Sequence, residues 1–176
     1  TYRNATLYDI LDDTGWGLHT AVPDFLDVQE PDDNADRCLG IFNLRTMVFR
    51  TVLENVKRTV VVKGERTTVE YETPYGKVRA AFVYDESMRK SGVTLTHTVE
   101  YAFKTVKDYA PLAHIFKNAR VERRDEGFLE FAAEVGDRGI PCSFAAIAGS
   151  PMHLILHELM PYDLFFYECR NHPDEM

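Results

Sequence analysis

Three short segments rich in β-branched and aromatic residues, joined by tight breaks, constrain the fold of this chain more than any other feature. They read RTVVVKG, RTTVEYETP and YGKVRAAFVYD, and the breaks fall at 64–65 and 74–76. Such residues favour strands, and short breaks containing glycine or proline join antiparallel neighbours. Between 67 and 72 the residues alternate between a drier and a wetter face. The sequence therefore predicts an antiparallel β-meander over residues 58–85.

After the meander, the spacing of apolar residues becomes that of helices. Thr105 and Asp108 form a T-x-x-D cap, and apolar residues up to position 116 then share one helix face. A second helix is predicted over 125–135, and Gly136 is suited to end it.

A continuous apolar run over 140–148 predicts a strand that is covered on both faces. The next residues, Gly149-Ser150-Pro151, predict a turn and a helix start, with Ser150 as the cap and Pro151 at the first helical position. Helix, turn, buried strand and helix in this order are typical of a parallel α/β sheet. The predicted fold class is therefore α/β, with the antiparallel meander ahead of the parallel part.

The chain divides into three predicted regions. Residues 1–57 show no sustained strand or helix period and predict an irregular N-terminal arm, residues 58–97 hold the meander, and residues 98–176 hold the α/β units. The chain starts without methionine, and NHPDEM at its other end has the cap, proline and acidic residues of a helix start. We therefore expect it to be a piece of a longer protein.

Composition narrows the function classes. The 176 residues, 45% of them hydrophobic, suffice for one globular domain with a core. The net charge of −8 and the scattered basic residues argue against nucleic acid or an anionic membrane as a partner. No apolar run approaches the roughly 18 residues of a membrane span. Cys38, Cys142 and Cys169 are far apart, which predicts reduced thiols in a cytoplasmic protein.

Five motifs in a fixed order carry a resemblance to a known family. Together they resemble the uroporphyrinogen decarboxylase-like superfamily, most closely its branch of corrinoid-linked methyltransferase-type proteins, over residues 67–176. They are a Thr-Pro-x-Gly hairpin at 73–76, a helix at 103–112, a turn at 135–139, Ser-Pro at 150–151 and the closing segment 163–175.

This resemblance implies a TIM-type (β/α)₈ barrel, of which the chain would hold the N-terminal part, with its active site at the carboxyl ends of the strands. It also implies methyl transfer involving a corrinoid or a thiol, with corrinoid and zinc as cofactors. The partners expected are a small-molecule substrate, a corrinoid protein, and either a second copy of the chain or the missing C-terminal half of the barrel. The chain departs from the family in having neither a His-x-Cys pair nor an RQAGRY stretch. Two alternatives remain: uroporphyrinogen decarboxylase proper, which decarboxylates a tetrapyrrole, and a non-catalytic α+β binding module.

Four residues are candidates for substrate binding, and no catalytic residue is predicted. Ser150 and His153 would lie at a helix start on the barrel rim, although capping alone explains the serine. His97 follows an extended run, and Arg89 lies in a charged loop where it could contact an anionic group. His153 and His157 share a helix face, but two histidines leave a zinc site short of ligands, so no metal site is predicted.

Overall fold

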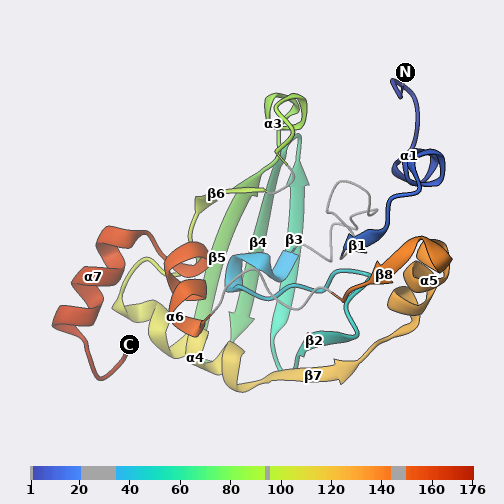
Figure 1. Cartoon of the computed structure of the whole chain (residues 1–176). Coiled ribbons are helices and arrows are strands. Elements are labelled where there is room, and N and C mark those ends of the chain that lie inside the picture. The colour runs from blue at the N-terminus through green and yellow to red at the C-terminus, as the bar shows by residue number, and fades with distance from the viewer. Residues whose placement is uncertain (1, 21–34, 94–95, 144–149) are drawn as a thin grey trace.

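A four-stranded antiparallel sheet forms the centre of the fold, with the strand order β3-β4-β5-β6 (Figure 1). The computed structural model describes residues 2–20, 35–93, 96–143 and 150–176. The first three strands confirm the predicted meander, and β6 adds a fourth. Their bounds are β3 Lys57–Lys63, β4 Arg66–Thr73, β5 Gly76–Val83 and β6 His97–Glu100.

The two hairpins of the meander form where the sequence supplies turn residues. Gly64, between β3 and β4, has φ +61°, a conformation that a residue without Cβ adopts without strain. Between β4 and β5, the hydroxyl of Thr73 accepts a hydrogen bond from the Tyr75 N–H at 3.1 Å and donates one to the carbonyl of Gly76 at 2.9 Å. These local contacts set the register of the strands.

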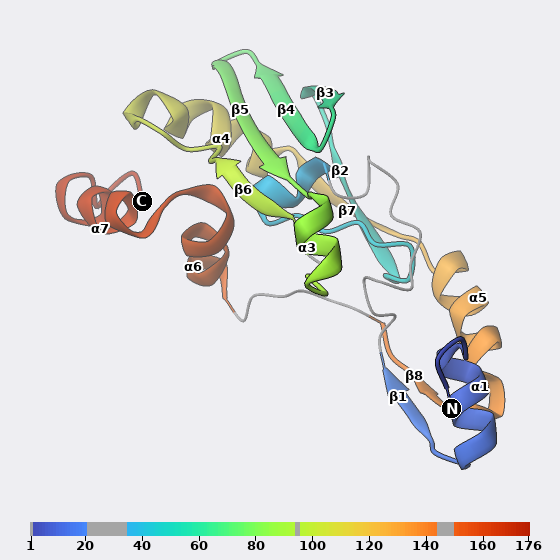
Figure 2. The ribbon, with the colours of Figure 1, turned by 90° about the horizontal axis from the view of Figure 1, so that it is seen from above.

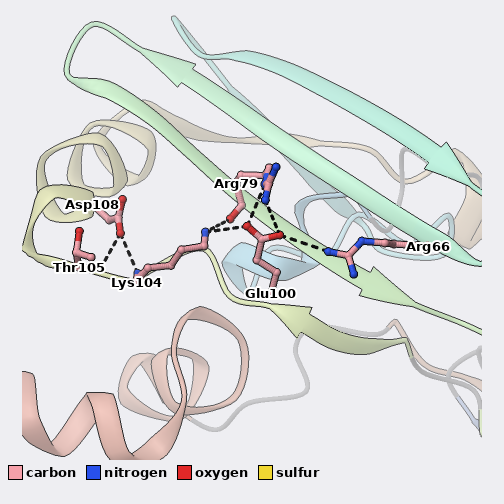
Figure 3. A network of polar contacts seen from close by, with 6 residues as sticks. All are labelled: Arg66, Arg79, Glu100, Lys104, Thr105 and Asp108. Carbon is pink, nitrogen blue, oxygen red and sulfur yellow. Dashed lines mark hydrogen bonds and ion pairs between the residues drawn. The ribbon is translucent and has the colours of Figure 1, made fainter.

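The two faces of this sheet differ. The inner face contributes Val69, Tyr71, Val78, Ala80 and Phe82 to the main hydrophobic core. The outer face carries ion pairs, the most connected of which centre on Glu100 and include Arg66, Arg79 and Lys104 (Figure 3).

Helices and turns supply the rest of the core. Leu39, Phe103, Leu112, Ile115 and Leu159 are buried against the inner face of the sheet. These residues come from, or lie next to, the 3₁₀ turns η1 (Asp36–Leu39) and η2 (Val106–Asp108), helix α4 (Tyr109–Lys117) and the π-helical turn η4 (Ile155–Leu159). Helices α3 (Glu86–Lys90), α6 (Pro151–Leu154) and α7 (Tyr162–Asn171) complete this part of the chain.

The helix caps predicted at Thr105, Gly136 and Ser150 are confirmed, whereas the helix start predicted in NHPDEM is not, because residues 173–175 form a turn after α7. Thr105 and Asp108 form a capping box at η2, which leads directly into α4. Helix α5 spans Glu126–Val135 and ends at Gly136, before the turn η3 (Gly136–Arg138). Ser150 caps α6 by accepting a hydrogen bond from the N–H of His153, and Pro151 occupies the first turn.

Two small sheets lie beside the central one. Strand β2 (Phe49–Leu53) pairs antiparallel with β7 (Ala119–Arg123), and β1 (Leu18–Thr20) pairs parallel with β8 (Gly139–Pro141). Helix α1 (Leu7–Thr14) and α5 lie with β1 and β8 at one end of the molecule (Figure 2). Within the region predicted to be irregular, the described residues thus hold a helix and two strands.

The prediction of a partial (β/α)₈ barrel is wrong. The central sheet is antiparallel, and β1–β8 is the only parallel pair among the described strands. The strand that follows α4 is β7, which pairs with β2 instead of with the strand after α5, so the described strands form no series of parallel crossovers.

The prediction of a buried strand over 140–148 is also not confirmed by the residues of this range that the structure describes, 140–143. Strand β8 ends at Pro141, and Ile140 is 64% exposed. Residues 144–148 lie outside the described residues. The apolar run therefore begins in a short strand that is exposed. The run of apolar residues predicted a strand covered on both faces, because it gives no information on what packs against the strand.

Candidate functional site

A cavity of about 420 Å³ lies between β2, the first half of β3 and the turn η1. This volume is within the range of small-molecule sites. Its lining combines charged, polar and aliphatic side chains: Asp36, Asn43, Arg50, Thr51, Val52, Leu53, Val56, Arg58 and Arg124.

Positive charge is concentrated in this lining. Arg50 comes from β2, Arg58 from β3, and Arg124 directly follows β7, whereas Asp36 is the one acidic residue among the described lining residues. The chain as a whole carries a net charge of −8, so a lining with three arginines stands out from its surroundings. Glu122, opposite Arg50 in the β2–β7 register, accepts two hydrogen bonds from that guanidinium, at 3.1 and 2.9 Å.

Arg58 is held by a buried carboxylate. Its Nη1 lies 2.7 Å from Oδ2 of Asp36, whose side chain is only 4% exposed. The other oxygen of Asp36 accepts a 2.8 Å hydrogen bond from the hydroxyl of Tyr71. Burial, above all, raises the pKa of Tyr71 far beyond its usual range, so this hydroxyl remains a donor. The Tyr71–Asp36–Arg58 chain therefore fixes one cationic wall of the cavity.

Arg124 is anchored at one nitrogen and unsatisfied at another. Its Nη2 donates to the carbonyls of Asn43 and Leu44 at 3.0 and 2.6 Å. Its Nε is buried and has no hydrogen-bond partner among the described residues. A buried donor that makes no hydrogen bond costs about 1–3 kcal/mol, and more when it is charged.

This arrangement is suited to binding more than to catalysis. Three guanidinium groups can orient and neutralise an anionic group, and the aliphatic residues Val52, Leu53 and Val56 can cover an apolar part of the same ligand. Among the described residues that line the cavity there is no histidine, cysteine or serine. In the described ranges, no three His, Cys, Asp or Glu side chains are placed to hold a metal ion.

A second cavity, of about 450 Å³, has a different character. It lies between α4 and η4, and its lining is mostly apolar: Phe103, Tyr109, Ala110, Leu112, Ala113, Phe116, Ile155, Leu159, Met160, Glu175 and Met176. Of the lining residues that the structure describes, Glu175 is the one charged residue, so few of these groups could orient a ligand.

The four residues predicted from the sequence lie elsewhere. Ser150 and His153 are exposed at the start of α6, and the ring of His153 lies 4.4 Å from that of His157. His97 is exposed at the start of β6. Arg89 lies in α3, where it contacts Glu65 at 3.5 Å and covers the ring of Tyr84. None of the four lines the arginine cavity, and their roles in substrate binding stay predictions.

The arginines that line the cavity are not among the candidate site residues predicted from the sequence. Each lies in or beside a strand whose pattern alone marks it as an ordinary charged position. The structure brings Arg50 and Arg124 together through the β2–β7 pairing, which joins segments that are far apart in the sequence. The sequence shows only that Arg50 and Arg124 each lie in or beside a strand-like segment, and it does not show that these two segments pair.

Comparisons with known proteins add no identification. No protein-family model matches the chain, and neither a curated protein nor a solved structure matches it. The helices of the described ranges include none that is long and apolar enough to span a membrane.

Proposed function

We propose that this chain is a small-molecule binding module whose arginine-lined cavity takes an anionic ligand with a carboxylate or phosphate group. One observation carries the proposal: three arginines line the cavity, and the Nη2 contacts of one of them, Arg124, are to neutral carbonyls. An anionic group in the cavity would add charge-assisted hydrogen bonds to these guanidinium groups.

The charge of the site supports an anion over a cation or a neutral ligand. Arg50 and Arg58 each have an acidic partner, Glu122 and Asp36, whereas the two contacts of Arg124 Nη2 are to neutral carbonyls. In these two contacts, carbonyl dipoles and not a carboxylate stabilise the positive charge of Arg124. An anion that enters the cavity would be attracted most strongly to this side of it.

The size of the cavity limits the ligand. A volume of about 420 Å³ accommodates a small metabolite with a short apolar part, which Val52, Leu53 and Val56 would cover. Because guanidinium groups are planar and bind two oxygens at once, they fit carboxylate and phosphate alike.

Calorimetric titration at low ionic strength tests the proposal, with citrate and inorganic phosphate as probes and glycerol as the neutral control. Arg124→Gln and Arg50→Gln should each weaken binding of the preferred probe about tenfold, because each removes a charged hydrogen bond worth roughly 1.5–3 kcal/mol. Added salt should also weaken binding. Whether citrate or phosphate binds more tightly distinguishes a carboxylate ligand from a phosphate ligand.

Arg120→Gln provides the matched control. Arg120 lies on the adjoining strand β7 and pairs with Glu54 at 3.1 Å, but it does not line the cavity. This variant should bind the probes as the unmodified protein does. The proposal fails if neither anion binds, or if Arg120→Gln weakens binding as much as Arg124→Gln.

The enzyme implied by the resemblance, one that transfers a methyl group to or from a corrinoid or thiol, stays a prediction carried by the quoted motifs alone. A binding module for a small anion needs no corrinoid and no zinc, so the titration tests it independently.

A further inference from the structure

A cysteine and a histidine meet beside the β1–β8 pair, and neither belongs to the lining of the arginine cavity. The Sγ atom of Cys142 lies 3.5 Å from Nε2 of His19. The same thiol also lies 3.8 Å from the carbonyl oxygen of Ile140. His19 is exposed and Cys142 is half-buried, so a small molecule in solution can reach the pair.

The β1–β8 pairing explains why these two side chains meet. His19 is opposite Ile140 in the parallel register, and Cys142 comes two residues after Ile140. Since side chains alternate between faces along an extended chain, Cys142 lies on the same face as its neighbour across the pair, His19. The contact therefore follows from backbone geometry and does not depend on the rotamer of a long flexible side chain.

Contacts on both sides hold this pair of strands in place. Arg138, just before β8, forms two hydrogen bonds with Asp12 of α1, at 2.6 and 2.8 Å. Ser143, directly after Cys142, accepts a hydrogen bond from the N–H of Val48 at 3.3 Å. The thiol thus lies between two anchored positions, which reduces the freedom it would lose on reaction.

We propose that Cys142 is a nucleophilic thiol, activated by His19 as general base, that reacts with small soft carbon electrophiles. In the reaction, the thiol proton moves to Nε2 of His19, and the sulfur forms a bond to the electrophilic carbon. With an alkyl halide the carbon–halogen bond breaks, halide leaves, and the imidazolium then loses the proton to water. A thiol next to a histidine is the arrangement in which cysteine is activated as a nucleophile.

The other two cysteines provide internal standards. Cys38 is buried, and desolvation raises the pKa of its thiol to about 12, so it should not react in the folded protein. Cys169 is exposed on α7 and should react at the rate of an ordinary accessible thiol. Accessibility alone would make Cys169 the faster of the two accessible thiols, whereas activation by His19 makes Cys142 the faster.

Alkylation of the full chain by iodoacetamide at neutral pH, with each cysteine quantified by peptide mass spectrometry, tests the proposal. Cys142 should react about tenfold faster than Cys169. His19→Gln should lower the rate of Cys142 to that of Cys169 and leave Cys169 unchanged. His97→Gln, which changes an exposed strand histidine elsewhere, should alter neither rate.

Equal rates at Cys142 and Cys169 in the unmodified protein would overturn the proposal. So would a Cys142 rate that His19→Gln leaves unchanged in a protein with native circular dichroism. If His19→Gln loses the native spectrum, the comparison of the two thiols in the unmodified chain decides alone.

Discussion

The side-chain amide of Asn43 binds the backbone of Thr51 as a neighbouring strand would. Oδ1 of Asn43 accepts from the N–H of Thr51 at 2.7 Å, and Nδ2 donates to the carbonyl of Thr51 at 3.0 Å. On its other side β2 pairs with β7. The carbonyl of Asn43 itself accepts from Arg124, so one asparagine links the strand edge to the arginine cavity.

Replacing this asparagine should cost stability. Asn43→Ala removes both hydrogen bonds and leaves two half-buried backbone groups of Thr51 unsatisfied, so we expect a loss of about 1–3 kcal/mol in the free energy of unfolding. Urea denaturation measures it. Asn171→Ala, at an exposed site on α7, is the control and should change stability by no more than about 0.5 kcal/mol. Equal effects of the two substitutions would contradict a strand-like role for Asn43.

A second prediction concerns Tyr71, whose side chain is fully buried. Tyr71→Phe keeps the ring in the core but deprives the buried carboxylate of Asp36 of its 2.8 Å hydrogen bond. We expect a loss of about 1–3 kcal/mol, because a hydrogen bond to a buried charge is replaced by nothing. Tyr75→Phe removes the hydroxyl of a side chain that is 65% exposed and should have almost no effect. A Tyr71→Phe protein as stable as the unmodified one would show that Asp36 does not need the hydrogen bond from Tyr71.

The acid dependence of stability should involve Glu100. Partial burial raises the pKa of this carboxyl, but hydrogen bonds from Arg79 and Lys104 and the charges of both outweigh burial, and the net pKa is lowered (Figure 3). An acid with a lowered folded-state pKa binds protons less readily when folded. Its stabilisation is therefore complete above the ordinary pKa of glutamate and is lost as the pH falls through the lowered folded value.

Carboxyl NMR titration of the folded protein measures this shift directly. The titration midpoint of Glu100 should lie below that of the unfolded chain, and Arg79→Gln should move it upward. Arg89→Gln, which removes an arginine paired with Glu65 instead, is the control and should leave the midpoint of Glu100 in place. A midpoint that does not respond to Arg79→Gln would contradict the assigned cause.

Local patterns allowed much of the secondary structure to be predicted from the sequence. The meander, the capping box at Thr105 and Asp108, and the cap at Ser150 depend on residues close together in the chain, and all three are confirmed. The same kind of local signal is present at α1, where Thr6 and Asp9 form a capping box within the region predicted to be irregular. Elements determined by neighbouring residues are therefore within reach of sequence analysis.

Tertiary pairing could not be predicted in the same way. Arg50 and Glu122 are 72 positions apart, and nothing local to either residue shows that β2 and β7 pair. The predicted barrel required the strand before α6 to extend a parallel sheet, whereas β8 pairs with β1 near the N-terminus. The candidate cavity depends on the β2–β7 pairing, so its residues became recognisable only from the three-dimensional arrangement.

The close approach of β1 to β8 leads to the last prediction. A Cβ built on Gly139 would lie 1.8 Å from the carbonyl oxygen of Leu18, a backbone atom that cannot move aside without moving β1. Gly139→Ala should therefore separate the strands, lower the free energy of unfolding by about 1–3 kcal/mol and slow the alkylation of Cys142, whose contact with His19 depends on this pairing. Gly17→Ala is the matched control: its Cβ would meet only the carbonyl oxygen of Arg138, at an ordinary 3.9 Å, so both stability and alkylation should stay unchanged. Urea denaturation and iodoacetamide kinetics on the two variants give both readouts. If the two variants had the same free energy of unfolding and the same alkylation rate of Cys142, the β1–β8 pairing would not be what brings His19 to Cys142.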